Sequence, residues 1–272
     1  LKIPVFAQDL VSQVGLAFVN LEMQRRLQEH AHTQGKCGGF EALPPNQTTQ
    51  EYLQNLKNLQ IMTKRDSAMA RMPWRRIQIR RQSPIQNAVA QVQEGNIRAM
   101  VEWLSSFKTR NHRAPTANDH IVQMKEKVER MVQSSSLPVR VDLINHASTK
   151  QKSLRVTIAG RSRPQELVIL GGHHDSVNIS WGHDGHAPGA DDNASGSSNL
   201  FEVLRILLAQ PQLERTVEVI WYAGEESGLL GSAEIAKAYR NGRVDVVGVM
   251  QMDMTSYPGS GEMTIVNLTD FT

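Results

Sequence analysis

Acidic residues and histidines gather in four separate stretches in the second half of the chain. These are GGHHDS (171–176), PGADDNASG (188–196), AGEESG (223–228) and the segment around Asp253. Histidine nitrogen combined with carboxylate oxygen suits zinc and other borderline divalent metals such as cobalt or manganese, whereas calcium and magnesium favour oxygen alone. Cys37 is the one cysteine, so a cysteine-based zinc site is excluded. These residue types indicate a divalent metal centre.

The helices and strands that must position these residues are typical of an α/β domain. Residues 153–159 alternate between apolar and polar side chains, as a half-buried strand does. Three further segments resemble buried strands: 167–170, 217–222 and 246–252. Apolar residues recur at helical spacing in four further segments: 96–107, 119–133, 195–209 and 229–240. This alternation predicts a mixed, mostly parallel central sheet flanked by helices.

The candidate ligands follow the predicted strands. His173 and Asp175 come after the strand at 167–170, and Glu225 comes after the strand at 217–222. Ligands of open α/β sheets bind beyond the carboxyl ends of the strands, so we expect the four stretches to converge there. Taken alone, each stretch has an ordinary explanation as a helix cap, a solvated turn or a packed histidine. Together, the carboxylates would repel one another, and a bound cation would resolve that repulsion.

The spacing within GGHHDS separates the roles of its polar residues. His173 and Asp175 are two apart in an extended segment, so their side chains project to the same side. Asp175 can therefore orient or polarise His173 as a ligand without binding the metal itself. His174 should face away from both, and we expect it to be a packing or surface residue.

The four motifs GGHHDS, PGADDNASG, YAGEESGLLGS and MQMDMTSYPGS, in this order, resemble those of the zinc-dependent M28 peptidases. The likeness is strongest to the secreted bacterial leucyl-type aminopeptidases, and it implies a zinc-exopeptidase (phosphorylase/hydrolase-like) fold. It covers residues 91–272 and assigns four metal ligands: His173, Asp192, Glu226 and Asp253.

The same resemblance assigns further roles. It implies two zinc ions bridged by Asp192, a cis peptide bond after Asp192, and Glu225 as general base. Met254 and Leu268 match positions that line the pocket for the substrate's first side chain, with ordinary core packing as the alternative. Bridged ions lie about 3.5–4 Å apart, so the backbone that carries Asp192 must come close to both. The glycines and alanines of PGADDNASG would allow that approach.

The function implied is hydrolysis of the N-terminal residue, expected to be apolar, from peptides by a metal-bound hydroxide. Zinc lowers the pKa of bound water from near 16 to about 7, and Glu225 would pass the proton to the leaving amine. The same scaffold could serve a carboxypeptidase or an aminoacyl cyclase, or persist as a truncated noncatalytic form. A serine hydrolase is set aside because the sequence has no G-x-S-x-G motif.

The balance of basic and acidic residues changes near residue 90. Residues 1–90 carry 12 Lys and Arg against 6 Asp and Glu, whereas residues 91–272 carry 18 against 21. We expect the first part to be an N-terminal extension that could serve as a propeptide, and the second to be the M28-like domain. The family has a further histidine ligand downstream of the QxDM motif, but all nine histidines precede Asp253. The sequence therefore predicts a domain truncated at its C-terminus that binds one metal well and the second poorly.

The partners expected from the resemblance are peptides, and the expected state is a secreted or periplasmic monomer. Nucleic acid is not an expected partner, because the arginine-rich RMPWRRIQIRR (71–81) lacks a recognised fold and an interleaved aromatic platform. Membrane insertion is not expected either, since no apolar run approaches the ~20 residues of a membrane helix.

Overall fold

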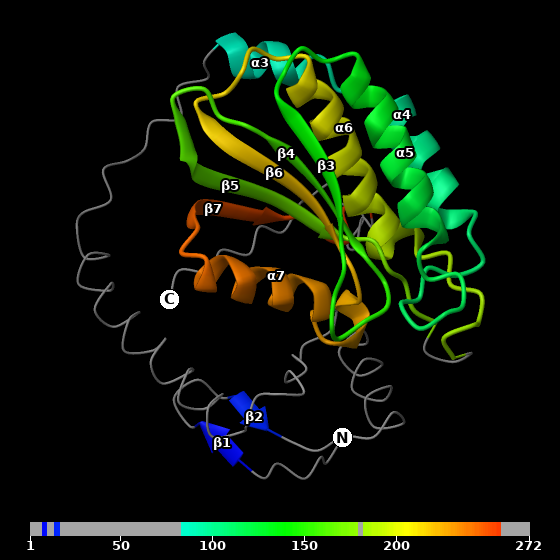
Figure 1. Ribbon diagram of the computed structural model, residues 1–272. Coiled ribbons are helices and arrows are strands. Elements are labelled where there is room, and N and C mark those ends of the chain that lie inside the picture. The colour runs from blue at the N-terminus through cyan, green and yellow to red at the C-terminus, as the bar shows by residue number, and fades with distance from the viewer. Residues whose placement is uncertain (1–6, 10–13, 17–82, 179–181, 257–272) are drawn as a thin grey trace.

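The computed structural model describes residues 7–9, 14–16, 83–178 and 182–256 (Figure 1). Its main feature is a five-stranded sheet in the order β3-β4-β6-β5-β7. The strands are β3 (Val139–Ile144), β4 (Ser153–Ile158), β5 (Arg163–His173), β6 (Arg215–Tyr222) and β7 (Asp245–Gln251). Two short strands, β1 (Ala7–Asp9) and β2 (Val14–Leu16), form a separate antiparallel pair.

The sheet is mixed, as the sequence predicts. β3 pairs with β4 and β4 with β6 in antiparallel fashion, while β5 pairs with β6 and with β7 in parallel. Parallel pairs therefore equal antiparallel ones in the five-stranded sheet and do not outnumber them. The parallel half consists of β6, β5 and β7, so the carboxyl ends of these three strands lie at one edge of the sheet.

Helices cover both faces of this sheet (Figure 1). On one face lie α4 (Glu94–Ser105), α5 (Asp119–Gln133) and α6 (Gly196–Leu208), with α3 (Ser83–Val89) near one end. On the other face lies α7 (Leu230–Asn241), whose Ile235 packs with Ile169 and Ile220 of the sheet. Among the described residues, no helix combines the length and apolar composition needed to cross a bilayer.

Most element positions agree with the hydrophobic periodicity, and the differences have physical causes. The helix at 119–133 has the bounds that the spacing predicts, because Ile121, Met124 and Val128 form one buried stripe. β5 is longer than the apolar run at 167–170, because Gly171 and Gly172 continue the ladder with β6. Backbone pairing of glycines leaves no hydrophobic pattern, so the sequence showed only the middle of this strand.

The core beneath α6 allows a direct test of this packing. Leu204 is fully buried in a cluster that includes Val219 and Trp221 of β6. Replacing Leu204 by alanine is expected to lower the free energy of unfolding by about 2–5 kcal/mol, because it leaves a cavity. The measurement is urea unfolding followed by circular dichroism. The exposed Val122→Ala on α5 is the control, expected within about 0.5 kcal/mol of the unchanged chain. Equal midpoints for Leu204→Ala and the control would contradict this packing.

Candidate metal centre

The candidate residues lie together near the carboxyl ends of three adjacent parallel strands. His173 is the last residue of β5, and Asp253 lies two residues beyond the end of β7. Glu225 and Glu226 begin a short 3-10 turn (Glu225–Ser227) that follows β6. Asp192 comes from the segment that leads into α6. The structure thus brings the four sequence stretches to one edge of the sheet.

Three of the side chains meet closely enough to share one ion. Ligand atoms of His173, Asp192 and Asp253 all lie within 4.8 Å of one another. His173 Nε2 is 2.9 Å from Asp192 Oδ1 and 3.4 Å from Asp253 Oδ1. Atoms that bind one tetrahedral zinc ion at about 2.0–2.2 Å are separated by about 3.4 Å, so these distances suit such an ion.

The chemistry of this donor set also fits a divalent cation. It combines one imidazole nitrogen with two carboxylate oxygens, a mixture found at zinc sites. Asp253 Oδ1 is buried and accepts no hydrogen bond from any residue that the structure describes. Because an unsatisfied buried carboxylate oxygen is costly, a cation bound beside it would stabilise the folded chain.

Asp175 contacts the His173 ring without joining the three-residue group, as its spacing from His173 indicates. Its Oδ1 lies 3.4 Å from His173 Nδ1, on the side of the ring away from Asp192. Its two oxygens also accept the backbone N–H groups of Glu225 (3.0 Å) and Glu226 (3.3 Å). Burial disfavours its charge, but the hydrogen bond and charge of His173 hold the pKa of Asp175 at about 2. Asp175 is therefore a fixed anion that links the ends of β5 and β6.

Glu225 has the environment of a proton carrier. Burial, together with repulsion from Asp175, Glu226 and Asp253, raises the pKa of Glu225 to about 8, although His173 acts in the opposite direction. Its Oε2 lies 3.8 Å from His173 Nε2, so its carboxyl group borders the three-residue group. A cation bound there would favour the charged form and lower this pKa. Glu225 is thus poised to accept and release a proton near neutral pH.

This pKa shift predicts a pH dependence for the metal-free chain. Between its ordinary value of 4.5 and about 8, Glu225 binds a proton in the folded but not in the unfolded chain. Its contribution to stability is therefore present below pH 4.5 and lost as the pH rises through 8. Glu225→Gln cannot ionise, so its unfolding free energy, relative to the unchanged chain, should increase between about pH 5 and about pH 9. Chelator-treated samples, unfolded by urea at both pH values, measure this difference, and a constant difference would contradict the shift.

Glu226 and the two predicted pocket residues stand apart from the three-residue group. Glu226 is buried beside Asp175 but is not among the residues whose ligand atoms lie within 4.8 Å of one another. Met254 follows Asp253 and is 37% exposed, and its N–H donates to Asn193 Oδ1 at 3.3 Å. Leu268 lies outside the described residues. The arginine-rich stretch at 71–81 lies outside them as well.

Small residues bring the segment that carries Asp192 against the neighbouring strand ends. A Cβ atom at Gly196 would lie 2.4 Å from the carbonyl oxygen of Met252, so a larger residue cannot fit there without movement. The peptide bond between Asp192 and Asn193 is cis, as the resemblance implies. The last glycine of PGADDNASG therefore packs directly against the backbone that follows β7.

The sequence reasoning missed Asn193, which joins three of the segments. Its Nδ2 donates to the carbonyl oxygens of Met252 (3.0 Å) and His173 (3.3 Å). Its Oδ1 accepts the N–H groups of Gly196 (2.9 Å) and Met254. Its place directly after the predicted ligand Asp192, as an amide among the small residues of PGADDNASG, was the available signal.

His174 is a packing residue, one of the two roles that its spacing left open. It is fully buried, and its Nδ1 lies 2.7 Å from His120 Nε2. Burial lowers the pKa of His174 to about 4, so the ring is neutral at physiological pH. His174 thus packs against His120 of α5, while its neighbour His173 faces the acidic residues.

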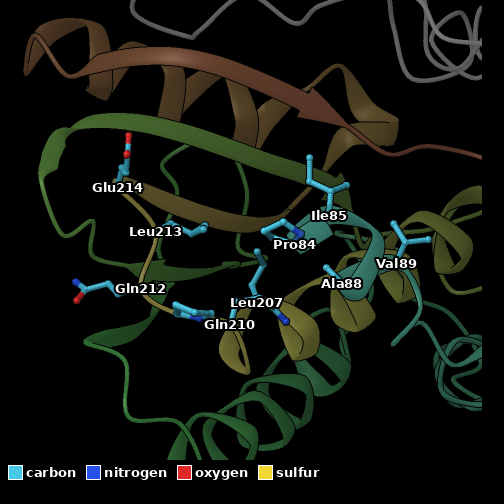
Figure 2. A pocket seen from close by; sticks show the side chains of 10 residues that line it. Pro84, Ile85, Ala88, Val89, Leu207, Gln210, Gln212, Leu213 and Glu214 are labelled. Atoms are coloured by element: carbon cyan, nitrogen blue, oxygen red, sulfur yellow. The ribbon is translucent and has the colours of Figure 1, made fainter. Parts of the chain in front are cut away.

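Figure 2 shows an apolar pocket that belongs to a different part of the fold. It lies between α3 and the connection from α6 to β6, and its walls include Ile85, Val89 and Leu213. Its one carboxylate is that of Glu214, and none of the predicted site residues lines it. With one carboxylate and no histidine or cysteine in its lining, the pocket lacks the set of ligands that a metal ion needs.

Comparison with known proteins agrees with this geometry. A family model described as peptidase family M28 matches residues 154–270. Leucine aminopeptidase 1 of Ajellomyces capsulatus (strain NAm1 / WU24) is 33% identical over 179 residues, which are 64% of this chain and 46% of that protein. The chain spans about half the length of the curated relatives it matches.

Solved structures show the same relationship. The LapA aminopeptidase of Legionella pneumophila is 27% identical with a TM-score of 0.59, over 66% of this chain and 47% of that one. LapB of the same organism shares the fold at 23% identity, with a TM-score of 0.72 over 94% of this chain and 67% of that one. Residues 154–270 therefore resemble peptidase family M28, and the chain is similar to aminopeptidases in sequence and fold.

Proposed function

We propose that this domain is part of a zinc-dependent metallo-exopeptidase, an aminopeptidase that removes N-terminal, preferably apolar residues from peptides. The observation that carries the proposal is the group formed by His173, Asp192 and Asp253 with Glu225 at its border. The M28 match and the names of the leucine aminopeptidase relatives support the reaction class.

The residues that would hold zinc divide into two sets. His173, Asp192 and Asp253 would hold one ion, because their ligand atoms already lie together. Glu226 would serve a second ion that shares Asp192, in agreement with the resemblance. Zinc, when bound, supplies a Lewis acid for the substrate carbonyl and lowers the pKa of a water molecule.

The proton transfers fall to Glu225. Its carboxylate would take a proton from the attacking water and deliver it to the amine nitrogen that leaves when the peptide bond breaks. Asp175 holds the backbone of Glu225 and faces the His173 ring, so base and ligand keep a fixed relation. This arrangement leaves the base free to move a proton without displacing the ligand.

The charge of the site favours a substrate with a free amino group. The side chains of Asp192 and Asp253 are 18% and 25% exposed, so their charges reach the solvent. A single divalent ion would balance the charges of Asp192 and Asp253. The neighbouring Asp175 and Glu226 would then keep the site net negative, which would attract a terminal ammonium group and repel a terminal carboxylate. The proposal therefore favours an aminopeptidase over a carboxypeptidase.

The test compares substrates that differ at the amino group. Zinc-loaded chain should hydrolyse leucyl-p-nitroanilide but not its N-acetylated form, and a chelator should stop the reaction. Release of residues from the carboxyl end would instead identify a carboxypeptidase, and cyclisation of an N-terminal glutaminyl peptide would identify a cyclase. Zinc binding without any of these reactions would identify a noncatalytic form.

Several features stay predictions of the sequence. They include the division into an extension (residues 1–90) and a peptidase domain (residues 91–272), the propeptide role of the extension, the monomeric state, and secretion or a periplasmic location. Most of residues 1–90 lie outside the described part of the chain. Met254 stays a proposed contact for the substrate's first side chain, since it lies exposed beside Asp253.

A further inference from the structure

A fully buried arginine binds the backbone on either side of the metal centre. The side chain of Arg110 has 0% exposure and donates hydrogen bonds to four carbonyl oxygens. Nε donates to His174 O (2.9 Å), Nη2 to Gly189 O (3.0 Å), and Nη1 to Leu104 O (2.9 Å) and Pro188 O. One planar guanidinium therefore connects three segments that are distant in the sequence.

Two of these segments lead directly to proposed ligands. His174 is the neighbour of His173, and Gly189 lies three residues before Asp192. The third contact, Leu104 O, is among the last carbonyl groups of α4, which have no partner within a helix and attract positive charge. Arg110 thus ties the segments of His173 and Asp192 to the end of a packed helix.

The charge of Arg110 is balanced by the acidic site and not by a direct ion pair. Within the described residues, no carboxylate lies within 4.0 Å of its guanidinium, which is unusual for a buried arginine. Burial lowers the pKa of Arg110 to about 10, while the charges of Asp175, Asp192 and Glu226 act in the opposite direction. Arg110 therefore remains a cation at neutral pH and offsets part of the negative charge at this edge.

The fit around Gly189 is tight enough for Arg110 to fix its position. Gly189 has a φ of +49°, in the left-handed region that favours glycine. A Cβ atom there would lie 2.8 Å from Arg110 Nη2 and 2.4 Å from the carbonyl oxygen of Asp192. The guanidinium, Gly189 and the Asp192 backbone therefore pack without spare room.

We propose that Arg110 is a positioning residue that sets the separation of His173 and Asp192, and thereby the zinc affinity of the domain. The inference rests on the metal centre proposed above. It requires the forked donor geometry of arginine as well as its charge, because the four carbonyl groups are reached from three different nitrogen atoms. Lysine would keep the charge but could not form this set of hydrogen bonds.

The test measures zinc affinity in the full chain by competition with a chromophoric chelator. Changes to residues that orient metal ligands typically weaken metal binding by about 10–100-fold. We expect Arg110→Lys to weaken binding about 10-fold and Arg110→Met about 100-fold. Arg205→Met is the matched control, because it removes an arginine that binds a backbone carbonyl (Gln91 O) and a carboxylate away from the centre. Its zinc affinity should stay within about twofold.

The unfolding temperature without zinc separates positioning from general support of the fold. A structural role alone would lower this temperature in Arg110→Lys but leave the zinc affinity of the folded chain unchanged, and that result would overturn the inference. If the unchanged chain binds no zinc, the metal centre itself is wrong and the inference falls with it. Equal zinc affinity in the unchanged chain and in folded Arg110→Met would reject the role of Arg110 and leave the proposed metal centre intact.

A second variant covers the case in which Arg110→Met does not fold. Gly189→Ala disturbs the same tightly packed contact while Arg110 remains, since its Cβ would approach both Arg110 Nη2 and the carbonyl oxygen of Asp192. We expect its zinc binding to weaken about 10-fold, as for Arg110→Lys. If neither of these variants folds in the presence of zinc, Arg110 has a structural role and the inference is wrong.

Discussion

Replacing Asp192 by asparagine is expected to abolish most zinc binding and to lower kcat/KM for leucyl-p-nitroanilide by about a thousandfold or more. Asp192 is the proposed ligand of both ions, and its Oδ1 lies 2.9 Å from His173 Nε2. An amide has nearly the same shape as the carboxylate but no negative charge, so the variant tests charge and not packing. Bound zinc per chain after dialysis and initial rates with the leucyl substrate give the two measurements.

The neighbouring Asp191 provides the matched control. Its Oδ1 accepts hydrogen bonds from Ser256 N–H (2.9 Å) and Ser195 Oγ (3.2 Å), and it is outside the three-residue group. Asp191→Asn should therefore retain zinc, with a loss of activity no larger than about tenfold. If Asp192→Asn held as much zinc as Asp191→Asn, Asp192 would not be a ligand.

Replacing Glu225 by glutamine is expected to lower kcat by about 10²–10⁴-fold while zinc binding changes only a few-fold. The amide cannot accept a proton from water, but it fits the same buried position. The backbone N–H of residue 225 can still donate to Asp175 Oδ1, so the support of His173 should persist. Steady-state kinetics with the leucyl substrate and the same chelator competition measure both properties.

Two comparisons make this second prediction specific. Glu234→Gln removes the charge of a glutamate on α7 that accepts backbone N–H groups from Ala147 (2.9 Å) and Ser148 (2.7 Å). It should leave kcat nearly unchanged, because Glu234 does not border the metal centre. A Glu225→Gln chain with nearly normal kcat would exclude Glu225 as the base. A variant that lost its zinc as well would instead indicate that Glu225 is a ligand.

The positions of the acidic residues could be predicted because strand ends have a clear signature. Each apolar run ends where polar residues begin, and parallel strands place those ends together. The two-residue spacing placed Asp175 beside His173, and both lie where that reasoning expects them. Asp192 does not follow a strand of the sheet, and its role came from the resemblance of the whole motif.

Other features left little trace in the sequence. The partners of Arg110 are backbone carbonyl groups, which every residue carries, so no residue pattern marked it as part of the centre. β3 was not predicted, although its residues VRVDLI alternate between apolar and polar side chains much as those of the strand at 153–159 do. The contact between His120 and His174 joins segments 54 residues apart, a separation that local periodicity does not reveal.

The central claim is that His173, Asp192 and Asp253 bind one divalent ion together. The most direct test is a crystal of the chain grown with zinc, with diffraction measured on both sides of the zinc absorption edge. The account predicts an anomalous peak within about 2.0–2.2 Å of His173 Nε2 and of one carboxylate oxygen from each aspartate. An anomalous map with no peak between these three side chains, at zinc concentrations that saturate binding in solution, would contradict it.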